Sequence, residues 1–188
     1  LNATSLSEGK TALMYAVRSG NLERAELLIQ SGADVDVEDA NGRTVLFDAV
    51  KKSKDAFYTL LADRVTSVDT QDSYGVTPLM IAAYEMNLSR LEDLLERGAS
   101  IRLKNKAGEN ASDIARKHLH RHIRRVVASE NKDEGSPHNT TTTEDVLKAQ
   151  KYNHELREMV RRMECLADGR SYEYKKFKRP FLRTQKAN

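Results

Sequence analysis

A repeat of 33 residues constrains this chain more than any other feature. Four residue types recur at that interval: Gly9, Gly42, Gly75 and Gly108; Thr11, Thr44 and Thr77; Leu13, Leu46 and Leu79; and Ala16, Ala49, Ala82 and Ala115. Self-similarity at a fixed period of this length is typical of repeat architectures, in which one small unit recurs along the chain. The sequence therefore predicts a stack of similar units over residues 1–128.

Each unit contains two short helical patterns. In the first unit they cover residues 12–18 and 22–30, with a turn at Ser19 and Gly20 between them. Residues 33–41 follow, with valines alternating against acids, which is typical of extended chain. Neither helix can bury an apolar face alone, so stability must come from packing between neighbouring units.

The first and last residues of the units resemble the ankyrin-repeat family. The openings read GKTALM, GRTVLF, GVTPLM and GENASD, and three endings read LLIQSGADVD, LLADRVTSVD and LLERGASIRL. The usual His of the opening is replaced by Met14, Phe47 and Met80. The resemblance implies an all-α solenoid of helix-turn-helix units with β-hairpin fingers. The units fall at about 5–37, 38–70, 71–103 and 104–128, the last being a capping repeat with Leu119 at the place of the turn glycine.

Residues 116–125, RKHLHRHIRR, belong to this last unit and hold five Lys or Arg, three His and no acid. A terminal repeat has one face without a neighbour, and that face must be polar to stay soluble. A zinc site needs three or four convergent ligands, whereas the chain is expected to turn between His118, His120 and His122. We interpret the stretch as a basic cap and predict no metal site, with nucleic-acid contact as an alternative.

No arrangement of residues typical of an active site is present. Cys165 has no His partner in a recognisable pattern. Gly9, Lys10 and Thr11 look like the end of a phosphate-binding loop, but the same slot recurs one unit later, so the repeat explains it. We predict a non-catalytic protein without a cofactor.

The resemblance implies that a protein partner contacts the fingers and the exposed side of each first helix. Tyr74 and Tyr84 stand out, because exposed tyrosines supply large, rigid contact area. Tyr84 has the alternative of packing against the neighbouring unit. The predicted contact residues are Arg18, Arg43, Lys51, Lys52, Tyr74, Val76, Tyr84, Glu85, Lys106 and Lys117.

Residues 129–143 are polar, contain Gly-Ser-Pro and four consecutive Thr, and are predicted to be a flexible linker. Residues 144–169 are predicted to form a separate amphipathic helix. Its apolar seam is able to pair with a second copy, with a groove on another protein, or with this chain's own repeats around Ile123, Val126 and Val127. The predicted partner-binding residues of the seam are Tyr152, Leu156, Met159, Met163 and Leu166.

The basic character of the chain is concentrated at its end. Residues 1–128 hold 18 Lys and Arg against 18 acids, whereas residues 169–188 hold seven against one. Aromatic residues alternate with these charges, which suits single-stranded nucleic acid, an acidic protein groove, an anionic membrane surface or a nuclear import receptor. The predicted binding residues of this tail, 170–188, are Lys175, Lys176, Phe177, Lys178, Arg179 and Phe181.

Together these patterns predict a protein-interaction adaptor or scaffold. It would hold one partner on the repeats and another through the C-terminal helix and tail. The alternative is a nucleic-acid-associated factor that uses the basic cap and tail while the repeats recruit a protein. No run of 18 apolar residues and no export signal are visible, so we expect a cytoplasmic or nuclear protein without a membrane span.

Overall fold

The computed structural model describes residues 1–51, 55–130 and 143–168, with side chains for all of these except 122–130, 143–150, 152 and 153. Within these ranges the chain forms eight α-helices and no β-strand, so the prediction of an all-α solenoid is confirmed. The helices are α1 (Ala12–Ser19), α2 (Leu22–Gln30), α3 (Val45–Ala49), α4 (Asp55–Leu61), α5 (Pro78–Tyr84), α6 (Leu88–Glu96), α7 (Ala111–Glu130) and α8 (Thr143–Ala167).

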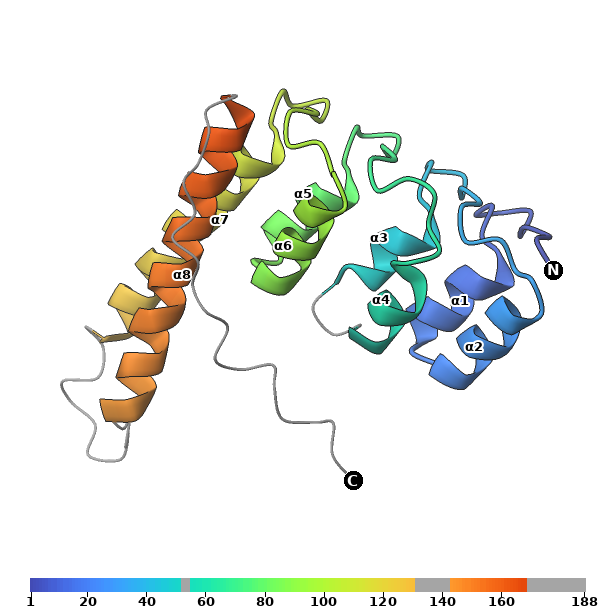
Figure 1. The fold of residues 1–188 in the computed structure, drawn as a ribbon, viewed down its shortest axis with the longest axis horizontal. Helices are drawn as coiled ribbons and strands as arrows, with labels where there is room; N and C mark the ends of the chain where they lie inside the picture. The colour runs from blue at the N-terminus through green and yellow to red at the C-terminus, as the bar shows by residue number, and fades with distance from the viewer. Residues whose placement is uncertain (52–54, 131–142, 169–188) are drawn as a thin grey trace.

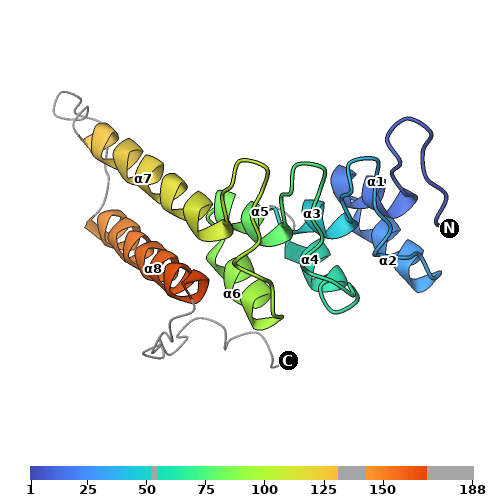
Figure 2. The same ribbon diagram turned by 90° about the horizontal axis from the view of Figure 1, so that it is seen from above.

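The helices lie in two rows. Helices α1, α3, α5 and α7 form one row, which we call the inner row, and α2, α4, α6 and α8 form the outer row on one side of it (Figure 2). The fingers that connect successive units project from one edge of the stack (Figure 1). The residues that repeat every 33 positions build the core, since Leu13, Leu46 and Leu79 are at most 1% exposed. One continuous apolar cluster runs from α1 to α8.

Two local signals separate the helices of a unit. Gly20 ends α1 in the left-handed conformation (φ 79°), and Asn21 then caps α2, its side chain accepting a hydrogen bond from a backbone N–H at 2.9 Å. The third unit repeats this with Met86 (φ 52°) and Asn87. In the first and third units, a left-handed residue followed by an Asn cap therefore marks the turn between the paired helices.

The fourth unit lacks both signals, and the predicted turn at Leu119 is wrong. Leu119 and His120 stand where the first unit has its glycine and asparagine, and neither favours the left-handed turn and N-cap. Helix α7 continues through this point from Ala111 to Glu130. Leu119 is 5% exposed and packs in the core.

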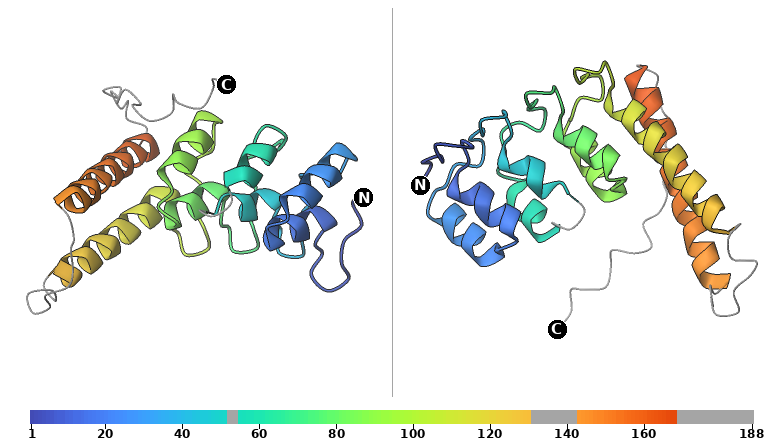
Figure 3. Two further views of the ribbon diagram at one scale, coloured as in Figure 1. Left: turned by 90° about the horizontal axis from the view of Figure 1, so that it is seen from below. Right: turned by 180° about the vertical axis from the view of Figure 1, so that it is seen from behind.

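Helix α8 packs against α7, in the row that α2, α4 and α6 occupy (Figures 2 and 3). Leu156, Met159 and Met163 are buried in the common core, and Arg116 of α7 pairs with Glu164 at 3.5 Å. The helix is therefore not separate from the stack, and docking on the chain's own repeats is the alternative that the structure adopts. Residues 131–142, most of the predicted linker, lie outside the described residues, as do the side chains around Ile123.

The fingers are tight turns held by one recurring side chain, and no β-strand is assigned to them within the described residues. Asp39, Asp72 and Asn105 stand 33 residues apart. Each side chain accepts hydrogen bonds from the backbone N–H groups two and four residues ahead, at 2.8–3.0 Å. The backbone N–H of the same residue donates to the carbonyl four residues ahead, at 2.9–3.0 Å, so side-chain and backbone bonds close each turn together.

Successive fingers are linked by backbone hydrogen bonds. The N–H groups of Ala40, Ser73 and Lys106 each donate to the preceding finger, at 3.0, 2.7 and 2.9 Å. A Cβ atom on Gly75 (φ 73°) would lie 3.1 Å from the backbone of Asn105, whereas one on Gly108 (φ 77°) would meet nothing within 4 Å. Glycine is thus needed at position 75 both for its left-handed conformation and for this close approach.

The second and third units also share a polar network in the outer row. The Tyr58 hydroxyl donates to Asp93 at 2.5 Å, and Arg97 donates to Asp93 at 2.6 Å and to the Ala62 carbonyl at 2.8 Å. Burial, followed by the bond to Asp93, raises the pKa of Tyr58. Burial also raises the pKa of Asp93, but the hydrogen bonds from Arg97 and Tyr58 outweigh it and hold this pKa below its ordinary value.

Candidate partner-binding groove

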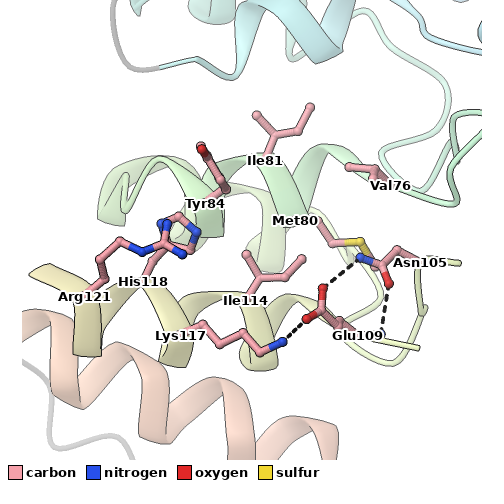
Figure 4. Close-up of a pocket in the computed structure, with 10 residues that line it drawn as sticks. All are labelled: Val76, Met80, Ile81, Tyr84, Asn105, Glu109, Ile114, Lys117, His118 and Arg121. Atoms are coloured by element: carbon pink, nitrogen blue, oxygen red, sulfur yellow. Dashed lines mark hydrogen bonds and ion pairs between the residues drawn. The ribbon is translucent and has the colours of Figure 1, made fainter. Parts of the chain in front are cut away.

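A groove with a volume of about 440 Å³ lies between the third and fourth units. Its walls come from α5, α7 and the two fingers that precede them (Figure 4). The lining residues are Val76, Met80, Ile81, Tyr84, Asn105, Glu109, Ile114, Lys117, His118 and Arg121.

Helical spacing brings these residues to one side. Ile81 and Tyr84 are three apart on α5, and Ile114, Lys117, His118 and Arg121 follow at intervals of three, one and three on α7. Met80 is buried, while Ile81 and Ile114 are half-buried and leave apolar surface in the groove. The groove therefore has an apolar floor with polar groups along the α7 side.

Tyr84 and His118 form an aromatic pair across the two units. Their ring centroids lie 4.2 Å apart and the planes are tilted by 52°. Tyr84 is still 57% exposed, so the contact with the neighbouring unit and the exposure to solvent coexist. Figure 4 shows the tyrosine hydroxyl directed away from α7, where a ligand can reach it.

At one end of the groove, the positive charge of Lys117 is neutralised by an acidic side chain. Lys117 forms an ion pair with Glu109, and Asn105 donates a hydrogen bond to the same carboxylate at 3.3 Å. The hydrogen bond from Lys117, and then the one from Asn105, lower the pKa of Glu109. Glu109 stays ionised at neutral pH and largely neutralises Lys117.

Arg121 lies next to His118 at the other end (Figure 4). Its side chain is exposed, and no acidic partner pairs with it among the side chains that the structure describes. The sequence of α7 also contains no acid between Asp113 and Glu130. Among the described side chains, the groove therefore combines an apolar floor with one positive charge that no acid compensates.

The predicted contact residues are distributed unevenly. Val76, Tyr84 and Lys117 line this groove, and Tyr74, 63% exposed, lies on the adjoining finger. Lys106 is exposed on the next finger. Glu85 is half-buried at the C-terminal end of α5.

Other predicted contact residues are engaged within the chain or lie elsewhere. Both Nε and Nη2 of Arg43 donate to Asp72, at 2.9 and 2.7 Å, so this side chain joins two fingers. Lys51 pairs with Asp48 at 2.6 Å, and Arg18 is exposed in the first unit. Lys52 lies outside the described residues.

The predicted binding seam of the C-terminal helix faces the chain's own core. Met163, Leu156 and Met159 are 0%, 1% and 7% exposed, so in this conformation they are closed to a partner. Leu166 is 36% exposed and lines a second, more open groove with residues of the third unit. The side chain of Tyr152 and the whole tail of residues 170–188 lie outside the described residues.

Sequence reasoning missed the apolar floor of the groove. It did not select Ile81 or Ile114 as contact residues, although Ile81 and Tyr84 share a helix face at a spacing of three, as Ile114 and Lys117 do. It also passed over the 33-residue interval that relates Asp39, Asp72 and Asn105. Both signals are present in the sequence and follow from the same period.

The described part of the chain contains no candidate metal site and no candidate membrane-spanning helix. There, no three His, Cys, Asp or Glu side chains are grouped so that they could hold a metal ion, and His118 packs against Tyr84. Among the described helices, none combines the length and apolar character needed to cross a bilayer.

The fold and groove define an elongated repeat protein with a surface suited to binding, and comparison with known families agrees. A family model described as ankyrin repeats (3 copies) matches residues 1–69 and again residues 32–105. The chain belongs to the ankyrin-repeat family. Proteins of this family generally mediate protein–protein interactions and are typically non-catalytic.

Similarity to individual proteins is confined to short stretches. The "Apicidin F cluster transcription factor apf2" of Gibberella fujikuroi is 49% identical over 47 residues, which are 25% of this chain and 12% of that protein. "Potassium channel AKT1" of Oryza sativa subsp. indica is 54% identical over 37 residues, or 20% of this chain and 4% of the channel. The chain thus spans only a small part of these relatives, and the likeness is one of repeat units.

Proposed function

We propose that this chain is a non-catalytic protein-interaction module whose partner binds in the groove between α5 and α7 and along the neighbouring fingers. The observation that supports it most is the convergence of Val76, Tyr84 and Lys117 around an apolar floor. Exposed aromatic side chains beside apolar surface are typical of the residues that dominate binding energy in protein interfaces.

The size and shape of the groove favour a segment of a protein over a small molecule. Small-molecule sites enclose most of their ligand, whereas this groove is partly open to solvent between α5 and α7. Tyr74 extends the exposed aromatic surface onto the finger beside Val76. A partner segment can therefore contact the groove and the finger together.

A second attachment through the C-terminal helix is not part of this proposal. Leu156 and Met163 are buried against the stack, and a partner would have to displace α8 to reach them. The tail, residues 170–188, lies outside the described residues, so a bridging role rests on its sequence alone.

The nucleic-acid alternative receives less support from the described residues. In the basic stretch at the start of α7, Arg116 pairs with Asp113 and Glu164, and Lys117 pairs with Glu109. A nucleic-acid site needs a row of uncompensated cations along the backbone of the ligand. Affinity for RNA or DNA that falls steeply with salt would favour the alternative.

Site-directed photo-crosslinking tests the proposal. A benzophenone side chain is placed at position 84 in the groove, at position 74 on the finger, or at position 26 as a control, since Glu26 is exposed on α2 in the outer row. We expect the same partner protein to be captured from positions 84 and 74 and not from 26. Equal capture from position 26, or none from position 84, contradicts the proposal.

A further inference from the structure

The charge arrangement of the groove narrows the class of partner. We infer that the groove selects an extended protein segment in which an acidic side chain follows an aliphatic one at a distance of two or three residues. The inference rests on the proposed function and specifies its ligand. The aliphatic side chain contacts Ile81 and Ile114, and the carboxylate meets Arg121.

The apolar end of the groove supports the aliphatic residue. Val76, Ile81 and Ile114 are each half-buried, so their remaining apolar surface faces solvent in the unbound protein. Covering that surface with a Leu, Ile or Val side chain removes apolar area from water at both surfaces, which is favourable. A polar or charged residue at this place would gain nothing and lose its own hydration.

The cationic end supports the acidic residue. Of the two cations in the groove, Lys117 is already paired with Glu109, whereas no described acid pairs with Arg121. A guanidinium is a planar fork of donors that matches a carboxylate and holds its charge at any physiological pH. A basic partner residue would be repelled here, so the same contact gives selectivity by charge.

Helix geometry sets the spacing between the two contacts. Ile114 and Arg121 are seven residues apart, which is about 10 Å along α7 at roughly 1.5 Å per residue. Side chains on a helix lean toward its N-terminus, which brings the long Arg121 side chain closer to Ile114. An extended segment rises about 3.3 Å per residue, so two or three residues span the gap.

The pair formed by Tyr84 and His118 lies beside this path and restricts the segment. The two ring centroids lie 4.2 Å apart, so the pair joins α5 to α7, and His118 lies on α7 between Ile114 and Arg121. A segment that follows the floor therefore passes along the exposed tyrosine ring before it reaches the guanidinium. The ring adds contact area without adding charge.

Selection from a random peptide library displayed on phage tests the inference, with the full chain as bait. We expect recovered peptides to carry Leu, Ile or Val followed two or three residues later by Asp or Glu. Arg121→Glu should weaken these peptides at least about tenfold, as loss and reversal of a charge contact implies, and should select Lys or Arg at the acidic position. Arg24→Glu, a charge reversal at an exposed residue of α2, is the matched control and should change neither.

The outcomes separate this inference from the proposed function. Tyr84→Ala changes a side chain that is 57% exposed, so it tests the groove without endangering the fold. If peptides bind, lose affinity with Tyr84→Ala, and are unaffected by Arg121→Glu, the acidic class is overturned while the groove remains. If neither variant alters any selected peptide, or none is selected, the binding function of the groove is overturned as well.

Discussion

The third and fourth units differ in how the apolar face of their first helix is covered. In the third unit α5 is covered by α6, which follows after a tight turn at Met86 and Asn87. In the fourth unit α7 runs on as one helix, and the covering helix α8 comes from beyond residue 142. An inner helix needs an apolar cover, but the cover does not have to be its neighbour in sequence.

This difference has an energetic consequence. The short turn between α5 and α6 fixes the two helices together at little cost in chain entropy, whereas joining α7 to α8 closes a longer connection. The docking of α8 therefore depends more on its buried side chains than on local signals. Substitutions in the two regions should therefore change the stability by different amounts and over different lengths of the chain.

The largest effect is expected where α8 meets the core. Met163 is 0% exposed, and Met163→Ala should lower the free energy of unfolding by about 3 kcal/mol through lost burial and a cavity. Arg161→Ala, on the exposed side of the same helix, is the control and should change it by less than about 0.5 kcal/mol. Equal, small effects in urea unfolding would show that α8 does not contribute to the stack.

A substitution at the contact between two fingers should have the next largest effect on stability. Gly75→Ala places a Cβ atom against the Asn105 backbone in a left-handed conformation, and we expect a loss of about 2 to 3 kcal/mol. Gly108→Ala has the same backbone conformation without the close approach, so only about 1 kcal/mol should be lost. Thermal and urea unfolding of the two variants measure the difference, and similar losses would contradict the role of close finger packing.

The period of the sequence predicted most of the stack, because a residue that packs the same way in each unit recurs at the same interval. Leu13, Leu46 and Leu79 are buried for that reason. Leu119 and His120 replace the left-handed residue and the Asn cap in α7. However, Ser53 and Lys54 do the same in the second unit, where α3 and α4 are separate helices, so these positions alone do not predict the missing turn.

The docking of α8 and the groove were less accessible to sequence reasoning. The seam of Leu156, Met159 and Met163 predicts a helix that needs a partner, but spacing alone does not say which surface provides it. The groove depends on Ile81 and Ile114, which belong to different units and meet only once the stack is built. Arg43 is predicted as a contact residue from its position in the repeat, whereas its pairing with Asp72 crosses two units and is not visible in the spacing of one unit.

A smaller effect is expected in the outer row, with a defined pH dependence. Asp93→Asn removes a charged acceptor from Tyr58 and Arg97, and we expect a loss of about 1 to 2 kcal/mol at neutral pH. Because the pKa of Asp93 is lower in the folded protein than its ordinary value of 3.8, this stabilisation is present above that value and is lost as the pH falls through the folded pKa.

The stability gap between the wild type and Asp93→Asn should therefore close as the pH is lowered from about 6 to about 2. Chemical unfolding over this range measures it. Glu96→Gln, at an exposed position of the same helix, is the control and should show no such gap. A gap that is constant with pH would mean that the charge of Asp93 is not what stabilises the network.

The smallest effect compares two helix caps at the same position of the repeat. The Thr77 hydroxyl accepts a hydrogen bond from the Met80 N–H at 3.2 Å, whereas Thr44 forms no side-chain cap bond. Thr77→Ala should cost about 1 kcal/mol and Thr44→Ala less. Equal losses in thermal unfolding would mean that burial of the threonine, and not capping, explains its recurrence.

The fourth unit depends on α8, which covers the apolar face of α7. The most direct test is amide hydrogen exchange of the full chain and of its Met163→Asp variant, followed by mass spectrometry. We predict that residues 111–121 and 154–168 are protected together in the wild type and lose protection together in the variant, while α1 to α4 keep theirs. If residues 111–121 keep their protection when α8 is displaced, α7 does not need α8 and the central claim is wrong.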